Sequence, residues 1–251
     1  RIAERDGFIF LRSRFNGVKS YSFPWGNGDI RNALRIIEDD AKERNADFSF
    51  YCLSQEQTEI LKEIYGIRLV LQEQRDFFDY VYLRERLATL SGRKYHSKKN
   101  HVNSFCKKND FSYEELNESN LKECLEFSHL WHKSGERNPK LDEEMLVIEK
   151  AFEHFSELHL SGALLRVDGK IVAYTLGEAM PDGKTYCTHF EKASPAYLTA
   201  YAVINKLFAE NSLSEFQYIN REDDAGVENL RKAKTSYHPE HLVKKYYGKI
   251  L

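Results

Sequence analysis

The stretch Gly162–Met180, GALLRVDGKIVAYTLGEAM, constrains the fold more than any other part of the sequence. Two runs of alternating apolar residues flank Asp168-Gly169, a dipeptide that favours a two-residue turn between antiparallel strands. A third strand is expected over 184–191, after a second turn that contains proline and glycine. The second half of the chain therefore contains an antiparallel sheet.

Helical and strand patterns surround this sheet in a definite order. Further strands are expected at 111–116, 215–219 and 241–247, and helices at 121–131, 141–155 and 200–208. A helix is also expected to start near Gly226. The order is strand, two helices, three antiparallel strands, helix, strand, helix, strand.

The first half of the chain repeats most of this order. Strands are expected at 8–11, 18–23, 48–53, 67–71 and 80–83, and helices at 30–41 and 60–65. The first strand and the two helices after it are missing. We therefore expect an N-terminal unit over 1–91 that is truncated at its start, a basic linker helix over 92–110, and a second unit over 111–251.

The composition is that of a folded protein whose charges nearly cancel. Of the 251 residues 41% are apolar, and the net charge is −2, so any contact with nucleic acid must be a local patch. The cysteines, at 52, 106, 124 and 187, lack zinc-site spacing and are expected to be reduced and mostly buried in a cytoplasmic protein. We expect no metal, no signal peptide and no membrane-spanning segment.

Two segments carry a resemblance to a known family. DYVYLRERLATLSGRKYHSKKNHVNSF and NLRKAKTSYHP resemble the bacterial DUF2156 proteins, which are similar to the C-terminal catalytic domain of phosphatidylglycerol lysyltransferases and more distantly to Fem-type aminoacyltransferases. The element order is similar to that of the GCN5-related N-acetyltransferases (GNAT). The resemblance implies an α+β fold of tandem GNAT-like units, with mixed, mostly antiparallel sheets flanked by helices.

The resemblance also implies a function. A member of this group would move an acyl or aminoacyl group from aminoacyl-tRNA or a coenzyme A thioester to an amine or hydroxyl acceptor, which could be a small molecule, a lipid or a peptide. No tightly bound cofactor is expected. The alternative is a non-catalytic module that binds RNA or another anionic ligand.

The charged segment Asn220–Pro239 supplies the main candidates for this chemistry. Lys234 and Tyr237 match the Lys-x-x-aromatic motif of Fem-type enzymes, which implies a lysine beside the transferred acyl group. Arg231 lies one helical turn earlier and is expected to face the same anion. Asp223 or Asp224 either caps the following helix or binds the attacking amine.

Three other sets of residues are candidates. Arg93, Lys94, Lys98 and Lys99 belong to a basic segment that either binds phosphates or is a solvated linker. Gly26 and Gly28 match part of the glycine-rich loop that holds the donor pyrophosphate in GNAT enzymes, although a turn before a helix capped by Asp29 also explains them. His189 either acts as a base or has a structural role.

Overall fold

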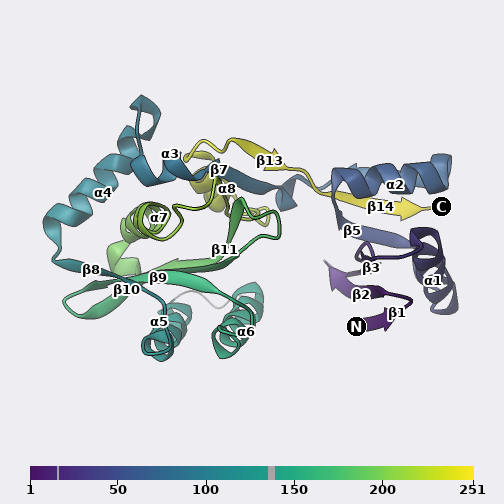
Figure 1. The fold of residues 1–251 in the computed structure, drawn as a ribbon, viewed down its shortest axis with the longest axis horizontal. Helices are drawn as coiled ribbons and strands as arrows, with labels where there is room; N and C mark the ends of the chain where they lie inside the picture. The colour runs from purple at the N-terminus through teal and green to yellow at the C-terminus, as the bar shows by residue number, and fades with distance from the viewer. Residues whose placement is uncertain (16, 135–138) are drawn as a thin grey trace. The chain divides into compact units, whose positions relative to one another are not determined.

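The computed structural model of the protein describes residues 1–15, 17–134 and 139–251 (Figure 1). It has two compact units. The first contains Arg1–Asp79, Asp223–Arg231 and Leu242–Leu251, and the second contains Tyr80–Glu222 and Lys232–His241. Each unit has its own mixed sheet and its own helices, so the predicted α+β class is confirmed.

The sheet of the first unit has the strand order β1-β2-β3-β5-β14-β6, and β4 pairs with β2. Its strands are β1 (Ile2–Arg5), β2 (Phe8–Phe15), β3 (Val18–Tyr21), β4 (Trp25–Gly26), β5 (Ser49–Leu53), β6 (Leu69–Glu73) and β14 (Tyr246–Ile250). Its helices are α1 (Ile30–Glu43) and α2 (Gln55–Tyr65), with short 3₁₀ turns at Gly66–Arg68 and Arg75–Phe77.

Local sequence explains where α1 begins and which face it buries. The Asp29 carboxylate accepts hydrogen bonds from the backbone N–H groups of Arg31 (2.9 Å) and Asn32 (3.2 Å), so this residue is the predicted N-cap. Ala33, Leu34, Ile37 and Ala41, at helical spacing, are buried in the core of the unit. That core also contains Phe50 of β5 and Ile250 of β14.

The sheet of the second unit has the strand order β13-β7-β12-β11-β10-β9-β8. Its strands are β7 (Asp79–Leu83), β8 (Phe111–Glu115), β9 (Ser161–Val167), β10 (Lys170–Ala179), β11 (Thr185–Ala193), β12 (Tyr218–Asn220) and β13 (His241–Val243). Its helices are α3 (Arg84–Thr89), α4 (His96–Lys108), α5 (Leu121–Ser134), α6 (Pro139–Glu153) and α7 (Ala200–Asn211), with 3₁₀ turns at Arg93–Tyr95 and Pro195–Tyr197. Helix α8 (Glu228–Thr235) begins in the first unit and ends in the second, and β7 and β13 also cross the boundary between the units.

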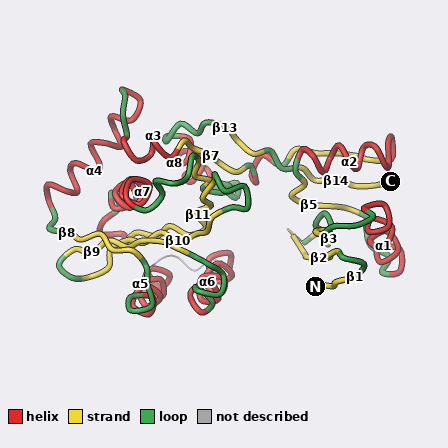
Figure 2. The backbone as a smooth tube through the Cα atoms, in the orientation of Figure 1, coloured by secondary structure: helices red, strands yellow, loops and turns green. Residues whose placement is uncertain are grey.

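Helices cover both faces of this second sheet. Helices α5 and α6 lie on one face and α7 lies on the other (Figure 1). Strands β8 to β11 are successive antiparallel neighbours (Figure 2), and Lys170 pairs with Val167 across the predicted Asp168-Gly169 turn. Strand β12 then joins β11 in parallel, with Cys187 opposite Asn220. The parallel pair places the end of β12 beside Cys187, so the residues after β12 lie next to the following part of β11.

Three expectations about organisation differ from the structure. The strand expected over 241–247 is two strands: β13 pairs in the second sheet, whereas β14 lies between β5 and β6 in the first. Strand β7, expected in the first unit, pairs with β12 of the second sheet. The segment 92–110 is not a linker, because α4 belongs to the second unit and packs on α7 there. The expected boundaries at 91 and 110 therefore do not separate the two units.

Candidate functional site

A bulge in β11 shapes the site in the second unit. Leu176 pairs with Phe190 and Gly177 pairs with Thr188, so His189 is an extra residue without an opposite partner on β10. A Cβ atom on Gly177 would lie 1.9 Å from the Cys187 carbonyl oxygen, and only glycine permits this approach. Bulges redirect side chains and are frequent beside active sites. Here the bulge lets the consecutive residues His189 and Phe190 line the same groove.

His189 contacts two carboxylates and a thiol. Its Nδ1 atom lies 2.8 Å from Glu222 Oε1, and its Nε2 atom lies 3.1 Å from Glu178 Oε1. The Cys187 sulfur is 3.8 Å from both His189 Nδ1 and Glu222 Oε1. Cys187 itself is buried, whereas His189, Glu178 and Glu222 are partly exposed.

These neighbours change the expected role of His189. The Cys187 sulfur and the Glu222 carboxylate raise the pKa of His189 to about 11, and burial opposes them only in part. The imidazole is therefore protonated at neutral pH and has no lone pair with which to accept a proton. The hypothesis that His189 is a base is not supported by these surroundings.

The groove beside His189 is large and acidic. Its volume is about 720 Å³. Ionisable side chains from α6, from the turn after it and from the strand ends line it: Glu144, Lys150, His154, Glu157, Glu178, His189 and Glu222. Glutamates outnumber the lysine and the histidines, so the groove suits a cationic group better than an anionic one.

A cationic cluster lies at the other side of the β12 end. The Lys98 Nζ atom is 4.2 Å from the centre of the Tyr237 ring, and the Arg221 Cζ atom is 5.1 Å from it. Burial, and then the charge of Arg221, lower the pKa of Lys98. Tyr237 is 6% exposed, and burial raises its pKa to about 12. The structure thus brings together the two segments that carry the family resemblance.

Arg221 is the most deeply placed cation of this cluster. Its Nη2 atom donates to both oxygens of Glu191 on β11, at 2.9 and 3.0 Å. Its Nη1 atom is buried and has no hydrogen-bond partner among the described residues. A buried guanidinium N–H without a partner is costly, and an anionic ligand is a natural acceptor for it.

Lys234 points toward the end of β12. Its Nζ atom donates to the Arg221 carbonyl oxygen at 2.6 Å and lies 6.0 Å from the Tyr80 ring centre. The hydroxyl of Tyr82 donates to the Lys234 carbonyl oxygen at 2.8 Å, which fixes the last turn of α8. Lys234 is therefore next to Arg221 and Glu222, although it does not line the acidic groove.

Arg231 and Asp224, both in the first unit, bind each other. Arg231 donates to the two Asp224 oxygens at 2.8 and 2.9 Å and to Asp76 at 2.6 Å, and Arg75 donates to Asp224 at 3.3 Å. Asp224 is fully buried. The expectations that Arg231 faces the same anion as Lys234, and that Asp224 binds an amine, are therefore not supported. Asp223 accepts from the Ala225 N–H at 2.8 Å, and α8 begins only at Glu228.

The remaining candidates are scattered. Arg93, Lys94 and Lys99 are exposed around α4, and Lys98 is the one of the four that turns inward. Gly26 and Gly28 line a cavity of about 440 Å³ in the first unit. Gly26 is required there because β2 and β4 pair closely: a Cβ atom would lie 2.0 Å from the Gly7 carbonyl oxygen.

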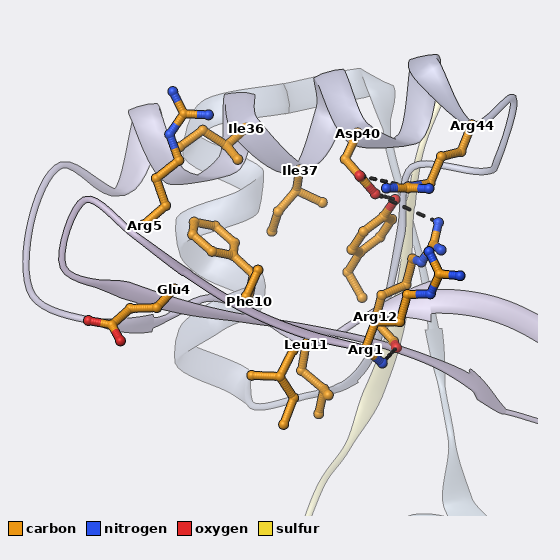
Figure 3. Close-up of a pocket in the computed structure, with 13 residues that line it drawn as sticks. Arg1, Glu4, Arg5, Phe10, Leu11, Arg12, Ile36, Ile37, Asp40 and Arg44 are labelled. Carbon is orange, nitrogen blue, oxygen red and sulfur yellow. Dashed lines mark hydrogen bonds and ion pairs between the residues drawn. The ribbon is translucent and has the colours of Figure 1, made fainter.

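The first unit also has a cavity of about 380 Å³ between its sheet and α1 (Figure 3). Phe10 and Ile37 line one part of it, and Arg12, Asp40 and Arg44 gather at the other (Figure 3). Asp40 accepts from the Arg44 Nε atom and the Tyr21 hydroxyl, both at 2.7 Å. The Tyr21 contact joins α1 to the sheet, whereas the Arg44 contact lies within the last turn of α1.

Sequence reasoning missed Glu178, Glu191, Arg221 and Glu222 as site residues. A signal for two of them was present, because Arg221 and Glu222 directly follow the strand before the charged segment. Cys187 was expected only as one of several buried thiols. Of the cysteines, Cys124 and Cys187 are buried, whereas Cys52 and Cys106 are exposed.

The chain is similar to known proteins over most of its length. A family model described as phosphatidylglycerol lysyltransferase, C-terminal, matches residues 1–248. A structure titled as a conserved protein of unknown function from Bacteroides thetaiotaomicron is 34% identical, with a TM-score of 0.90, and the match covers 100% of this chain and 85% of that one. An uncharacterized protein of Mycoplasmoides gallisepticum is 25% identical over 77% of this chain, and the match spans 62% of that relative.

More distant structures show the fold. L-PGS from Bacillus licheniformis has a TM-score of 0.68 at 13% identity, over 97% of this chain and 81% of that one. A tandem GNAT protein from the clavulanic acid biosynthesis pathway has a TM-score of 0.54 at 8% identity, over 96% of this chain and 78% of that one. The predicted tandem GNAT-like fold is confirmed. Among the helices that the structure describes, none has the length and apolar character needed to cross a bilayer.

Proposed function

Because the chain belongs to the phosphatidylglycerol lysyltransferase C-terminal family, we propose that it is a transferase that moves an aminoacyl group from aminoacyl-tRNA to an amine or hydroxyl acceptor. A coenzyme A thioester is the other donor to be tested. One observation carries the assignment of the site. The consecutive residues Arg221 and Glu222 belong to two opposite environments, a cationic cluster and an acidic groove.

The cationic cluster is the proposed site for the donor's phosphates. Lys98 and Arg221 approach one tyrosine ring, and the charge of Arg221 already lowers the pKa of Lys98. A phosphate between them would relieve this repulsion and accept from the buried Nη1 of Arg221. Glu191 accepts hydrogen bonds from Nη2 of Arg221, so a phosphate would be the acceptor for Nη1.

The acidic groove is the proposed site for an ammonium group. Glu178 and Glu222 stand at its strand end, and Glu157 lines it from the turn after α6. An amine acceptor enters such a groove in its charged form and must lose a proton before it can attack. Glutamate carboxylates at the groove are the candidate proton acceptors.

Lys234 is the proposed electrostatic catalyst. In the reaction, the acceptor nitrogen or oxygen forms a bond to the acyl carbon, and the bond from that carbon to the donor oxygen breaks. One proton of the acceptor goes to the leaving oxygen, and the extra proton of an ammonium acceptor passes through a groove glutamate to solvent, so the reaction is balanced without a further reagent. The ammonium of Lys234, held at the Arg221 carbonyl, would stabilise the oxyanion that forms between these two events.

The test is a transfer assay with purified protein. Total tRNA charged with labelled amino acids, and in a separate arm labelled acetyl-CoA, is incubated with phosphatidylglycerol vesicles or with a lysine-containing peptide. We expect label to move from tRNA to one of these acceptors. Lys234→Ala should lower the rate on the order of a hundredfold, whereas Lys122→Ala, a change at an exposed lysine of α5, should not.

Binding gives a second readout for the cationic cluster. Lys98→Met keeps most of the side chain and removes its charge. It should weaken tRNA binding and reduce the slope of log K against log salt by roughly one unit, with Lys122→Met as the matched control. Salt-dependent binding without transfer in either arm would reject the transferase and leave an anion-binding module. If the protein neither binds tRNA nor transfers label, both the transferase and the anion-binding module are rejected.

A further inference from the structure

The bulge in β11 places three different metal-ligand atoms together. Cys187 and His189, two residues apart on β11, meet Glu222, which follows β12. The sulfur, Nδ1 and Oε1 atoms all lie within 4.8 Å of one another. Neither the proposed transfer reaction nor the donor site requires this combination of a thiol, an imidazole and a carboxylate.

The distances between the three ligand atoms are close to those of a tetrahedral site. Zinc bonds of about 2.3 Å to sulfur and about 2.0–2.1 Å to nitrogen or oxygen set neighbouring ligand atoms about 3.3–3.6 Å apart. In the structure the sulfur is 3.8 Å from both other atoms, and Nδ1 is 2.8 Å from Oε1. A shift of about half an ångström in the Glu222 side chain, which is 44% exposed, and a smaller approach of the sulfur to Nδ1 give the required triangle.

We propose that Cys187, His189 and Glu222 bind a divalent transition-metal ion, with zinc as the best match to this ligand set. Thiolate and imidazole ligands select zinc over magnesium or calcium. No metal was expected from the sequence, because Glu222 is 33 residues away from His189 and the three ligands form no metal-binding motif along the chain.

Glu178 supplies the outer contact that such a histidine needs. It lies 3.1 Å from the Nε2 atom, on the opposite side of the ring from Cys187 and Glu222. A ring N–H donated to a carboxylate fixes the tautomer in which the other nitrogen faces the metal. Glu178 thus orients His189 for metal binding through Nδ1 and is not itself a ligand.

The backbone also holds Glu222 in position. Its φ angle of +53° is in the left-handed region, which non-glycine residues seldom adopt. The Glu222 N–H donates to Asn220 Oδ1 at 2.8 Å, and the Glu222 carbonyl accepts from the Tyr80 N–H at 3.0 Å. Strained residues held by such contacts are concentrated at ligand sites. The strained turn directs the carboxylate at His189.

Three protein ligands leave one coordination position open. His189 and Glu222 line the acidic groove, so that position faces the groove. Zinc sites with three protein ligands and an open position are typical of catalytic or substrate-binding zinc rather than structural zinc. The forms that bind a metal ion are the Cys187 thiolate and a His189 ring with an unprotonated Nδ1 atom. The inference is independent of the proposed transfer reaction, because binding is measured without a donor.

Cobalt is the probe for the test. The full chain is stripped with EDTA, dialysed and titrated with CoCl₂, and ZnSO₄ is then added in competition. We expect a single equivalent of cobalt to produce the strong visible bands of a tetrahedral ion and a sulfur-to-cobalt charge-transfer band. Zinc should abolish both. Cys187→Ser should remove the charge-transfer band, and His189→Gln should prevent tight binding.

Two further variants make the test decisive. Glu178→Gln should keep the charge-transfer band but weaken binding by about 10- to 100-fold. Cys106→Ser, a change at an exposed thiol of α4, should leave spectrum and affinity unchanged. Circular dichroism identifies the variants that fold. A folded variant at Cys187, His189 or Glu178 is enough to test the proposed ligand set. The proposal is overturned if the stripped protein takes up no cobalt, or if folded variants at Cys187 or His189 bind it as before.

Discussion

At the scale of single residues, two arginines of the charged segment have different surroundings. Arg231 donates to Asp224 and Asp76, so carboxylates of its own unit meet its charge. Arg221 donates to Glu191 through Nη2, and Nη1 is buried without a hydrogen-bond partner among the described residues. The sequence shows that a residue is charged, but it does not show whether that charge is free to bind a ligand or is already paired within the protein.

Asp40 is expected to make the stability of the first unit depend on pH in the acid range. Burial alone would raise its pKa, but the hydrogen bonds from Tyr21 and Arg44 hold it below the ordinary value of 3.8. A lowered pKa in the folded state contributes stability above the unfolded-state pKa, and this is lost as pH falls through the folded-state pKa. Asp40→Asn should lower Tm near neutral pH and flatten the decline of Tm below about pH 4.

Thermal unfolding between about pH 7 and about pH 2.5 checks this expectation. Asp39→Asn is the matched control, because Asp39 is the exposed neighbour on the same helix. It should give the same curve as the unaltered protein. A curve for Asp40→Asn that runs parallel to the unaltered one over the whole range would contradict the assignment.

At the scale of elements, the β10–β11 bulge depends on Gly177. Gly177→Ala forces a Cβ atom against the Cys187 carbonyl oxygen, so one strand must move. The free energy of unfolding should fall by about 1–3 kcal/mol, and the NMR signals of the His189 ring should shift because the strand carrying it moves. Denaturant unfolding and imidazole NMR measure the two effects.

Gly169→Ala in the β9–β10 turn is the comparison. Nothing lies within 4 Å of its Cβ position, so only the φ of +76° opposes the change. We expect the free energy of unfolding to fall by about 1 kcal/mol and the NMR signals of the His189 ring to stay unchanged. If Gly177→Ala leaves those signals unchanged as well, the bulge does not position the histidine.

The local sequence predicted those elements that depend on interactions between residues close together in the chain. The Asp168-Gly169 turn and the Asp29 cap follow from short-range geometry, and both are found. The buried face of α1 follows from helical periodicity. The residues Cys187, His189 and Glu222 meet only through the parallel β11–β12 pair and a bulge, which no local pattern encodes.

At the scale of the whole molecule, strand partners could not be predicted. The pattern of 241–247 indicates extended chain but does not say that β13 and β14 belong to different sheets. Two lysines separate them, and each pairs in the first unit: Lys244 with Glu73 at 2.7 Å and Lys245 with Asp79 at 3.0 Å. Strand pairing is decided by tertiary packing, which the local pattern does not encode, and the two compact units are not divided at residue 91.

Ile250 tests how β14 contributes to the first unit. It is 5% exposed in the core of that unit, between β5 and β6. Ile250→Ala should lower the free energy of unfolding of this unit by about 2–4 kcal/mol. Hydrogen exchange should increase in β5 and β6 and stay unchanged in β9 to β11. Leu251→Ala, at a side chain that is 69% exposed, should change neither the free energy of unfolding nor the hydrogen exchange of these strands. Faster exchange spread equally over both sheets would contradict this division.

The position of β14 has a consequence for synthesis on the ribosome. Chains emerge from the N-terminus, and domains usually fold in that order. Here β5 and β6 are translated early but have no partner between them until β14 has emerged, after every strand of the second sheet. The unit that is translated first is therefore the unit that can be completed last, and until then two unpaired strand edges are open to chaperones or to other nascent chains.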